Sequence, residues 1–296
     1  MERRADPAWD SFWRYDRLSS FHAAPGAPNY ASHVADGWRA FFATLPNGAR
    51  VLDLATGNGA IAVLAVEAGK DFTVTGADLA DVDPTAFVTR NRTELERIRF
   101  MPNTPAEVLP LPDASIDAIV SQYGLEYSDL SSSIPEAARV LAPGGRLRLA
   151  IHATEGAVVR DTAKSIADAD FLLALALTAL ADRSVAELDA FNAGLRAIAD
   201  RVPTATDRPM LANVHKTLCD TFDHRRAELV PTAARLCAEI AAHRDRQAAL
   251  LAAARSAEQM RELGERLEAL GLGDVSHGEQ RDEPDCIAHV IEARRG

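Results

Sequence analysis

The stretch VLDLATGNGAIAV, residues 51–63, constrains the fold of this chain more than any other segment. It starts as a short apolar run typical of a buried strand and ends as an apolar helix. Between the two, Gly57 and Gly59 lack a Cβ, so the main chain can turn tightly and approach a ligand closely. The pattern predicts a strand, turn and helix around an adenosine-bearing ligand. Nicotinamide dinucleotides and S-adenosylmethionine (SAM) both fit it.

Strands and helices alternate on both sides of this unit. Such alternation predicts a parallel sheet with helices on both faces. Ser133 and Glu136 have the spacing of a capping box, so one helix is expected to begin near Ile134. The expected strands are 50–55, 71–78, 98–101, 114–123 and 146–152, and the other expected helices are 30–44, 60–68 and 84–97.

The alternation of strands and helices stops after residue 152. About a hundred alanine-rich residues with helical spacing follow, including one long helix over 229–254. Ser256 and Gln259 then begin a last helix, and residues 274–279 and 286–293 alternate as an antiparallel strand pair. We therefore predict an α/β, Rossmann-like, seven-stranded and mostly parallel sheet, with a helical insertion between strands five and six. The expected parts are an N-terminal helical lid (1–48), a cofactor-binding core (49–152), the insertion (153–255) and a final helix with the strand pair (256–296).

Composition excludes several classes of function. The formal net charge of −11 argues against sequence-independent nucleic-acid binding, which needs a basic surface. The longest apolar run, residues 171–180, is about half of the ~20 residues that span a membrane, so no membrane partner is expected. The charged, aromatic N-terminal residues do not resemble a signal peptide. Three cysteines without paired spacing favour a reducing compartment, and we expect a cytoplasmic protein.

Asp53 separates the two candidate ligands. This acid lies inside the first strand, directly before the glycine turn. A carboxylate there would repel the pyrophosphate of a dinucleotide. It suits SAM, which carries a sulfonium and an ammonium and has no phosphate. Asp78, at the end of the second strand and about 20 residues beyond the turn, is placed to accept hydrogen bonds from ribose hydroxyls.

With these features, the chain resembles the class I SAM-dependent methyltransferases with a type 11-like domain. Four segments match the motifs of that family in the right order, and the final strand pair agrees with its seven-stranded sheet. The strand-four segment differs from the Asn/Asp-Pro-Pro-aromatic motif of enzymes that methylate exocyclic base amines. The matching segments are VLDLATGNG (51–59), VTGADLA (74–80), AEVLPLPDASIDAIVSQYGLEY (106–127) and RVLAPGGRLRLAI (139–151).

The resemblance implies a SAM site made from these motifs. The glycine turn would surround the methionine part, Asp78 would hold the ribose and Leu79 would pack on the adenine. Gln122 would lie under the sulfonium. Two positions depart from the family: Ala55 replaces the first glycine, and Pro105 stands where an acid often binds the adenine amine. The implied cofactor residues are Asp53, Ala55, Thr56, Gly57, Asn58, Gly59, Asp78, Leu79, Thr104, Pro105, Ala106 and Gln122.

Candidate catalytic residues follow strands four and five, because the carboxyl ends of parallel strands form the substrate side of such sheets. They are His152, Tyr123 and Glu126. His152 is the candidate general base, or else a structural residue at the strand end. Glu126 could bind a cationic acceptor, bind the cofactor ammonium, or be structural. Methyl transfer needs a base only when the acceptor keeps its proton at neutral pH.

Two further groups of residues are candidates for a functional role, one as a lid and one as a metal site. Trp9, Trp13, Tyr15, Phe21 and His22 could form a lid over the cofactor or simply pack on the sheet edge. His215 and Cys219, one helical turn apart, could with His224 suggest a metal, but a closed zinc site wants four ligands, and we predict no metal.

The function predicted from the sequence is methyl transfer from SAM to a small-molecule acceptor whose reacting atom is oxygen, nitrogen, carbon or sulfur. One alternative is a protein that binds SAM without transferring a methyl group, and another is a methyltransferase with a peptide or protein acceptor. The helical insertion could cover the acceptor site, form a homodimer face, or do both. A nicotinamide-dependent oxidoreductase is disfavoured by Asp53 and by the absence of a Tyr-Lys pair after strand four.

Overall fold

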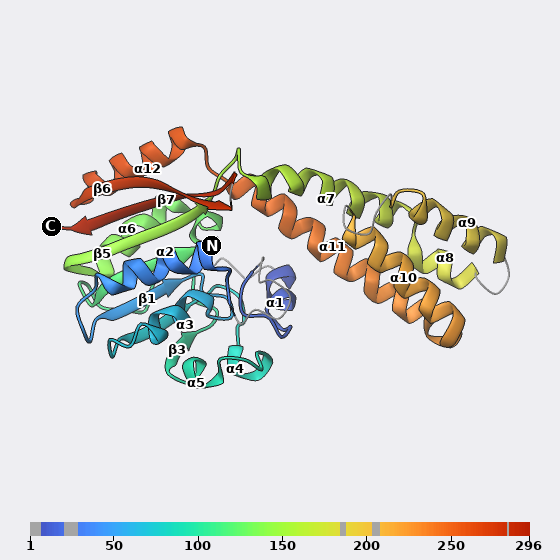
Figure 1. The fold of residues 1–296 in the computed structure, drawn as a ribbon, viewed down its shortest axis with the longest axis horizontal. Helices are drawn as coiled ribbons and strands as arrows, with labels where there is room; N and C mark the ends of the chain where they lie inside the picture. The colour runs from blue at the N-terminus through green and yellow to red at the C-terminus, as the bar shows by residue number, and fades with distance from the viewer. Residues whose placement is uncertain (1–6, 21–28, 184–187, 203–207, 283) are drawn as a thin grey trace. The chain divides into compact units, whose positions relative to one another are not determined.

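The computed structural model describes residues 7–20, 29–183, 188–202, 208–282 and 284–296. The chain forms two compact units (Figure 1). The first unit comprises residues 1–159 and 253–296, and the second comprises residues 160–252. Within the described ranges, no helix is both long and apolar enough to cross a membrane.

The first unit is built on a seven-stranded sheet with the order β3-β2-β1-β4-β5-β7-β6. The pairs among β3, β2, β1, β4 and β5 are parallel, whereas β7 runs antiparallel to both β5 and β6. The predicted fold class is therefore confirmed. The strands are β1 Arg50–Leu54, β2 Thr73–Ala77, β3 Ile98–Met101, β4 Ile116–Gln122, β5 Leu141–His152, β6 Leu272–Asp282 and β7 Asp285–Arg295.

Helices cover both faces of this sheet. Along β1, Val51 packs with α2 (Ser32–Ala43) and α3 (Ala60–Glu67), and the next residue, Leu52, packs with α6 (Leu130–Val140) and α12 (Ala257–Ala269). This alternation follows from the period of two in a strand. Trp38 and Phe42 of α2 are wholly buried, and burying an aromatic side chain of this size contributes about 1.5–3 kcal/mol.

The second unit is helical. Its helices share a hydrophobic core of their own, which includes Leu172, Phe191, Leu218 and Leu236. The apolar run that begins at Phe171 contributes to this core, as expected for a buried helix. The helices are α7 Ala157–Ala174, α8 Leu177–Arg183, α9 Leu188–Ala199, α10 Pro209–His224, the 3-10 turn η2 Arg226–Glu228 and α11 Leu229–Ala253, with the ends of α7 and α11 belonging to the first unit.

Two helix predictions were wrong. The expected helix over 84–97 is split into α4 (Pro84–Phe87) and α5 (Arg92–Leu95), because Val88 is extended and Asn91 is left-handed, with φ +53°. The helix expected near Ile134 begins earlier, at Leu130, where the Asp129 carboxylate accepts the Ser131 N–H. Asp129 caps the helix one turn before Ser133, and the Ser133 hydroxyl pairs with that of Ser128 instead. The capping box of Ser256 and Gln259 is confirmed.

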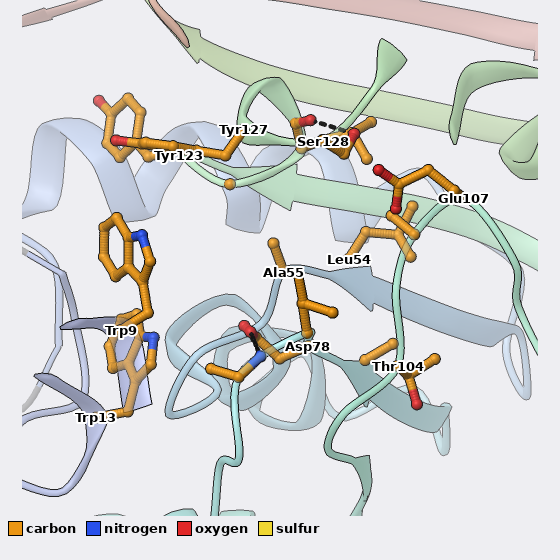
Figure 2. A pocket seen from close by; sticks show the side chains of 16 residues that line it. Trp9, Trp13, Leu54, Ala55, Asp78, Thr104, Glu107, Tyr123, Tyr127 and Ser128 are labelled. Carbon is orange, nitrogen blue, oxygen red and sulfur yellow. Dashed lines mark hydrogen bonds between the residues drawn. The ribbon is translucent and has the colours of Figure 1, made fainter. Parts of the chain in front are cut away.

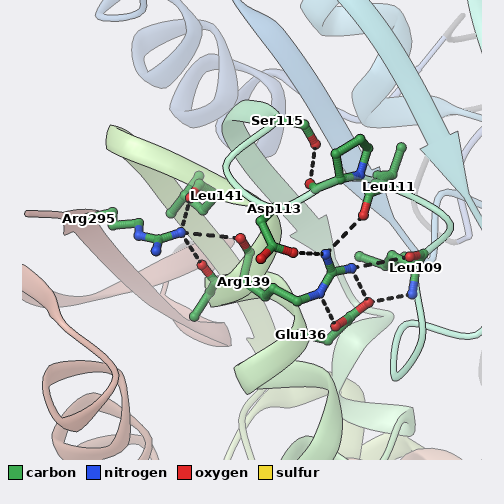
Figure 3. A network of polar contacts seen from close by, with 10 residues as sticks. Leu109, Leu111, Asp113, Ser115, Glu136, Arg139, Leu141 and Arg295 are labelled. Carbon is green, nitrogen blue, oxygen red and sulfur yellow. Dashed lines mark hydrogen bonds and ion pairs between the residues drawn. The ribbon is translucent and has the colours of Figure 1, made fainter.

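An arginine network holds the loop between β3 and β4 against α6 (Figure 3). The Arg139 guanidinium donates to Asp113, to Glu136 and to the carbonyl oxygens of Leu109 and Leu111. The Glu136 carboxylate in turn accepts the Leu109 N–H at 2.6 Å. These bonds from Arg139 lower the pKa of Glu136 below its ordinary value. The network fixes the loop whose first part, residues 104–107, reaches the site described next.

Candidate active site

A pocket opens at the carboxyl ends of β1, β2 and β4 (Figure 2). It holds about 740 Å³ of space not filled by protein atoms, part of it open to solvent. The lining residues are Trp9, Trp13, Leu54, Ala55, Ala77, Asp78, Leu79, Ala80, Thr104, Ala106, Glu107, Tyr123, Gly124, Leu125, Tyr127 and Ser128.

The glycine turn has the shape that its sequence predicts. Gly57 and Gly59 both adopt positive φ, at +53° and +86°, and Gly59 directly precedes α3. A Cβ on Gly57 would lie 2.4 Å from the Trp13 ring, and a Cβ on Gly59 would lie 2.9 Å from Phe100. Both positions therefore require glycine for space as well as for conformation.

Asp78 follows β2 and lies at the centre of this arrangement. Its Oδ2 accepts the Gly57 N–H at 2.7 Å, and its Oδ1 accepts the Ala80 N–H at 2.8 Å. The side chain lines the pocket, and its burial raises the pKa to about 6. A carboxylate oxygen can accept more than one hydrogen bond, so Asp78 still has capacity for the hydroxyls of a ligand.

Asp53, buried on β1, lines a second and smaller cavity. Its Oδ2 accepts the Thr56 hydroxyl at 2.7 Å and the Ala62 N–H at 3.2 Å. Because Gly59 has no side chain to cap α3, Asp53 satisfies one of the free N–H groups of that helix. Burial raises the pKa of Asp53 to about 7.

On the other side of the pocket, Leu79, Thr104 and Ala106 contribute to the wall, whereas Pro105 does not line it. The Thr104 N–H donates to the Asp78 carbonyl at 2.8 Å, which joins this segment to the end of β2. Sequence reasoning missed Glu107 and Ser128 as lining residues. Glu107 belongs to the matched AEVLP segment, so the motif offered a signal for it, but Ser128 had none.

An aromatic segment covers the pocket from the N-terminal side. Trp9 and Trp13 both belong to α1 (Pro7–Trp13) and both line the pocket, whereas Tyr15 is largely exposed. The Asn58 amide, wholly buried, donates to the carbonyl oxygens of Trp13 at 3.0 Å and Arg17 at 2.7 Å. The Asn58 side chain thus holds the segment in place. Phe21 and His22, the other candidate lid residues, lie outside the described residues.

The Gln122 side chain joins a buried polar network at the end of β4. Its Oε1 accepts the Trp38 Nε1–H at 2.6 Å, and its Nε2 donates to Gln280 at 2.9 Å. Gln280, on β6, also accepts the Tyr123 hydroxyl at 2.8 Å. Sequence reasoning missed Trp38 and Gln280, because both reach the site only through the folding of distant segments. Tyr123 itself has φ +57°, an uncommon conformation for a bulky residue.

The three candidate catalytic residues contact one another beside this network, but Tyr123 alone of the three lines the two cavities. His152 ends β5, and its Nδ1 lies 2.7 Å from Glu126 Oε1, which also accepts the His152 main-chain N–H at 3.1 Å. Glu126 lies on the 3-10 turn η1 (Leu125–Tyr127), and both side chains are almost completely buried. The Tyr123 ring stacks on the His152 ring, with centroids 4.5 Å apart.

In the second unit, the Cys219 sulfur lies 3.8 Å from His215 Nε2. Among the residues that the structure describes, no three His, Cys, Asp or Glu side chains group closely enough to hold a metal ion.

The family described as a methyltransferase domain matches residues 51–145. This part of the chain is a methyltransferase domain. The resemblance to class I enzymes is thereby confirmed, and SAM is the cofactor of that class. The match begins with β1 and ends at Gly145 inside β5, so it contains the glycine turn, Asp78 and the end of β4 but stops short of His152.

The chain is also similar to individual proteins. A demethylmenaquinone methyltransferase from Thermus thermophilus is 39% identical over 101 residues, which cover 33% of this chain and 44% of that protein. An uncharacterized methyltransferase from Mycobacterium bovis is 37% identical over 143 residues, covering 46% and 53%. The chain thus spans about half the length of these curated relatives. A solved SAM-dependent methyltransferase from Aquifex aeolicus is 15% identical, with a TM-score of 0.48 over 93% of this chain and 100% of that one.

The residues of this pocket fit SAM. Asp78 has acceptor capacity for ribose hydroxyls, and the apolar side chains of Leu79, Ala106 and Leu125 line the space where a flat base would pack. The adjoining cavity is lined by Asp53 and by the Ser20 and Thr56 side chains, which suits the polar amino-acid part of the cofactor.

Proposed function

We propose that the protein is a SAM-dependent methyltransferase with a small-molecule acceptor. SAM supplies an activated methyl group, so the protein has mainly to align the acceptor with that group and exclude water. The observation that carries the proposal is the Asp78 carboxylate, buried in the pocket and bonded to the Gly57 N–H of the methyltransferase motif.

Each part of the pocket has an assigned task in this proposal. Asp78 accepts the ribose hydroxyls, Leu79 packs on the adenine, and Asp53 favours the cationic end of the cofactor. Asp53 does so best when ionised, above the pKa of about 7 to which burial raises it. Asn58 contributes indirectly, because its amide holds the main chain of Trp13 and Arg17 and so keeps the aromatic segment over the pocket.

The pair of His152 and Glu126 is proposed to accept the proton of the acceptor. When the imidazole proton sits on Nδ1, it donates to Glu126 Oε1 at 2.7 Å, which leaves Nε2 as the basic atom. The Glu126 carboxylate then stabilises the imidazolium that forms. Such a base serves an acceptor that is protonated at neutral pH, such as an alcohol or a phenol.

Enclosure favours a small acceptor over a protein. Trp9 and Trp13 close one side of the pocket. A folded protein could present only a thin side chain to a pocket enclosed in this way. A homodimer and a cytoplasmic location, both expected from the sequence, stay predictions.

The proposal is tested first by calorimetric titration of the purified protein with SAM and with S-adenosylhomocysteine (SAH). We expect one site per chain, and Asp78→Ala should weaken both ligands by more than tenfold because it removes the ribose contact. Asp36→Ala, an exposed aspartate on α2, is the matched control and should bind normally. No binding of either ligand by the wild-type protein would refute the proposal.

Acceptor chemistry is tested next. The protein is incubated with SAM and a panel of phenols, amines, thiols and carboxylic acids, and SAH and methylated products are followed by mass spectrometry. Turnover of one class supports the proposal. Binding of SAM without turnover of any class favours the alternative of a SAM-binding protein, and methylation of a peptide library alone favours a peptide acceptor.

A further inference from the structure

The two cavities of the site share part of their walls. The larger cavity contains Asp78 and the smaller one contains Asp53. Both are lined by the same four residues, which therefore surround the junction between them: Trp9, Trp13, Ala55 and Tyr123. Three of the four present aromatic rings, and Ala55 adds only a methyl group.

The aromatic rings at this junction are packed into a continuous group. Trp9 and Trp13 lie nearly parallel, with centroids 6.5 Å apart, and Trp9 meets the edge of Tyr127 at 5.4 Å. The His152 ring links Tyr127 to Tyr123, with centroids 6.2 Å from the first and 4.5 Å from the second. Figure 2 shows the Trp9 indole between Trp13 and the two tyrosines, beside the space above Ala55 and Asp78.

A ligand that reaches from Asp78 to Asp53 would lie against these shared residues. In SAM the atom between the ribose and the amino-acid part is the sulfonium sulfur, which carries the methyl group that is transferred and leaves as the uncharged sulfur of SAH. An aromatic face attracts a cation that lies within about 6 Å of it, and indole does so most strongly. In a cofactor bound in this way, the rings would lie where it carries its positive charge.

We propose that Trp9, Trp13 and Tyr123 form an aromatic binding site for the sulfonium, which favours charged SAM over its uncharged product SAH. This inference rests on the proposed function. It gives the N-terminal segment a part in recognition of the reactive centre, beyond simple cover. After methyl transfer the cation is gone, so the attraction of the rings for the product is weaker.

The position of these rings is built into the fold. Asn58 holds the main chain of Trp13 and Arg17, and the missing Cβ of Gly57 leaves room for the Trp13 ring. Asp10, on α1, accepts the Asp81 N–H at 2.9 Å, which ties the same helix to the loop after β2. Tyr123 is fixed by its hydroxyl bond to Gln280.

The test compares the affinities for SAM and SAH in single variants by calorimetry. Trp9 is the best position, because its side chain is only half-buried and lines both cavities. Trp9→Leu should weaken SAM about threefold to thirtyfold, whereas the affinity for SAH changes less than twofold to threefold. Trp9→Phe keeps an aromatic face and should shift the ratio of the two affinities less.

Two controls separate charge from packing. Phe12 contacts the Trp9 ring but lines neither cavity, so Phe12→Leu should leave the ratio of SAM to SAH affinity unchanged. Sinefungin, which carries an ammonium in place of the sulfonium, should weaken in Trp9→Leu as SAM does. An equal loss of SAM and SAH in Trp9→Leu would overturn the inference and leave the proposed function standing. No binding of either ligand by the wild-type protein would overturn the proposed function itself.

Discussion

Replacing Gly57 by alanine tests how the glycine turn and the aromatic cover fit together. The new Cβ would lie 2.4–2.7 Å from three atoms of the Trp13 indole, and Gly57 has φ +53°. Gly69 offers a matched control in the same unit. It has φ +68°, but nothing lies within 4 Å of the position of its Cβ. The pair separates the backbone cost of alanine from its steric overlap.

The expected magnitudes follow from these two terms. A left-handed conformation costs a residue with a Cβ about 1–2 kcal/mol, so Gly69→Ala should lower the free energy of unfolding by that amount. Inserting a methyl group into a packed contact costs about 1–3 kcal/mol more. Gly57→Ala should therefore lower the free energy of unfolding by about 2–5 kcal/mol and displace Trp13 from the pocket.

Urea unfolding followed by circular dichroism measures both variants, in the absence of ligand. Trp13→Ala is then added to the wild-type protein and to Gly57→Ala. Once the indole is absent, alanine at position 57 should cost no more than alanine at position 69. The reasoning is refuted if Gly57→Ala and Gly69→Ala destabilise the protein equally, or if the cost of Gly57→Ala is the same with and without Trp13.

Three further predictions concern buried polar groups. Asn58→Ala leaves two carbonyl oxygens without its amide and should lower the free energy of unfolding by about 1–3 kcal/mol in urea titrations; an unchanged value would contradict its anchoring role. Burial raises the pKa of Asp53 to about 7, against about 3.9 in an unfolded chain, so the folded form binds the extra proton between these values. The free energy of unfolding of the wild-type protein should thus rise as the pH falls from 8 to 5. Urea titrations across that range should show a smaller rise for Asp53→Asn, which has no carboxyl group at this position. Glu126→Gln should lower kcat for a hydroxyl acceptor about 10²-fold to 10⁴-fold without changing SAM affinity, measured by SAH formation and calorimetry; a normal kcat would exclude the base.

Much of the fold was predictable because its signals are local. The period of apolar residues and the glycine turn place β1 and α3, and the alternation of residues 286–293 places β7. Where two local signals compete, the sequence is ambiguous. Ser133 has a good capping pattern, but Asp129 precedes it and takes the cap. The backbone conformations of Val88 and Asn91 break the helix expected over 84–97. The charged residues around them have helical spacing, so the sequence pattern does not indicate the break.

The site was predictable where the family's motifs contain its residues. Asp78, Leu79 and Ala106 lie in matched segments, and all three line the pocket. Gln280 comes from the far end of the chain and reaches Tyr123 only because β6 and β7 fold back onto β5. The Asn58 amide shows a second limit. Its place in the glycine turn suggested a ligand contact, whereas its bonds to the N-terminal segment depend on tertiary structure.

A crystal structure of the protein with SAH tests the central claim most directly. The account predicts SAH in this pocket, with its ribose hydroxyls within hydrogen-bond distance of the Asp78 carboxylate. The sulfur should lie at the junction between the two cavities, against Trp9 and Ala55. A ribose bound away from Asp78, or an empty pocket at saturating SAH, would contradict it.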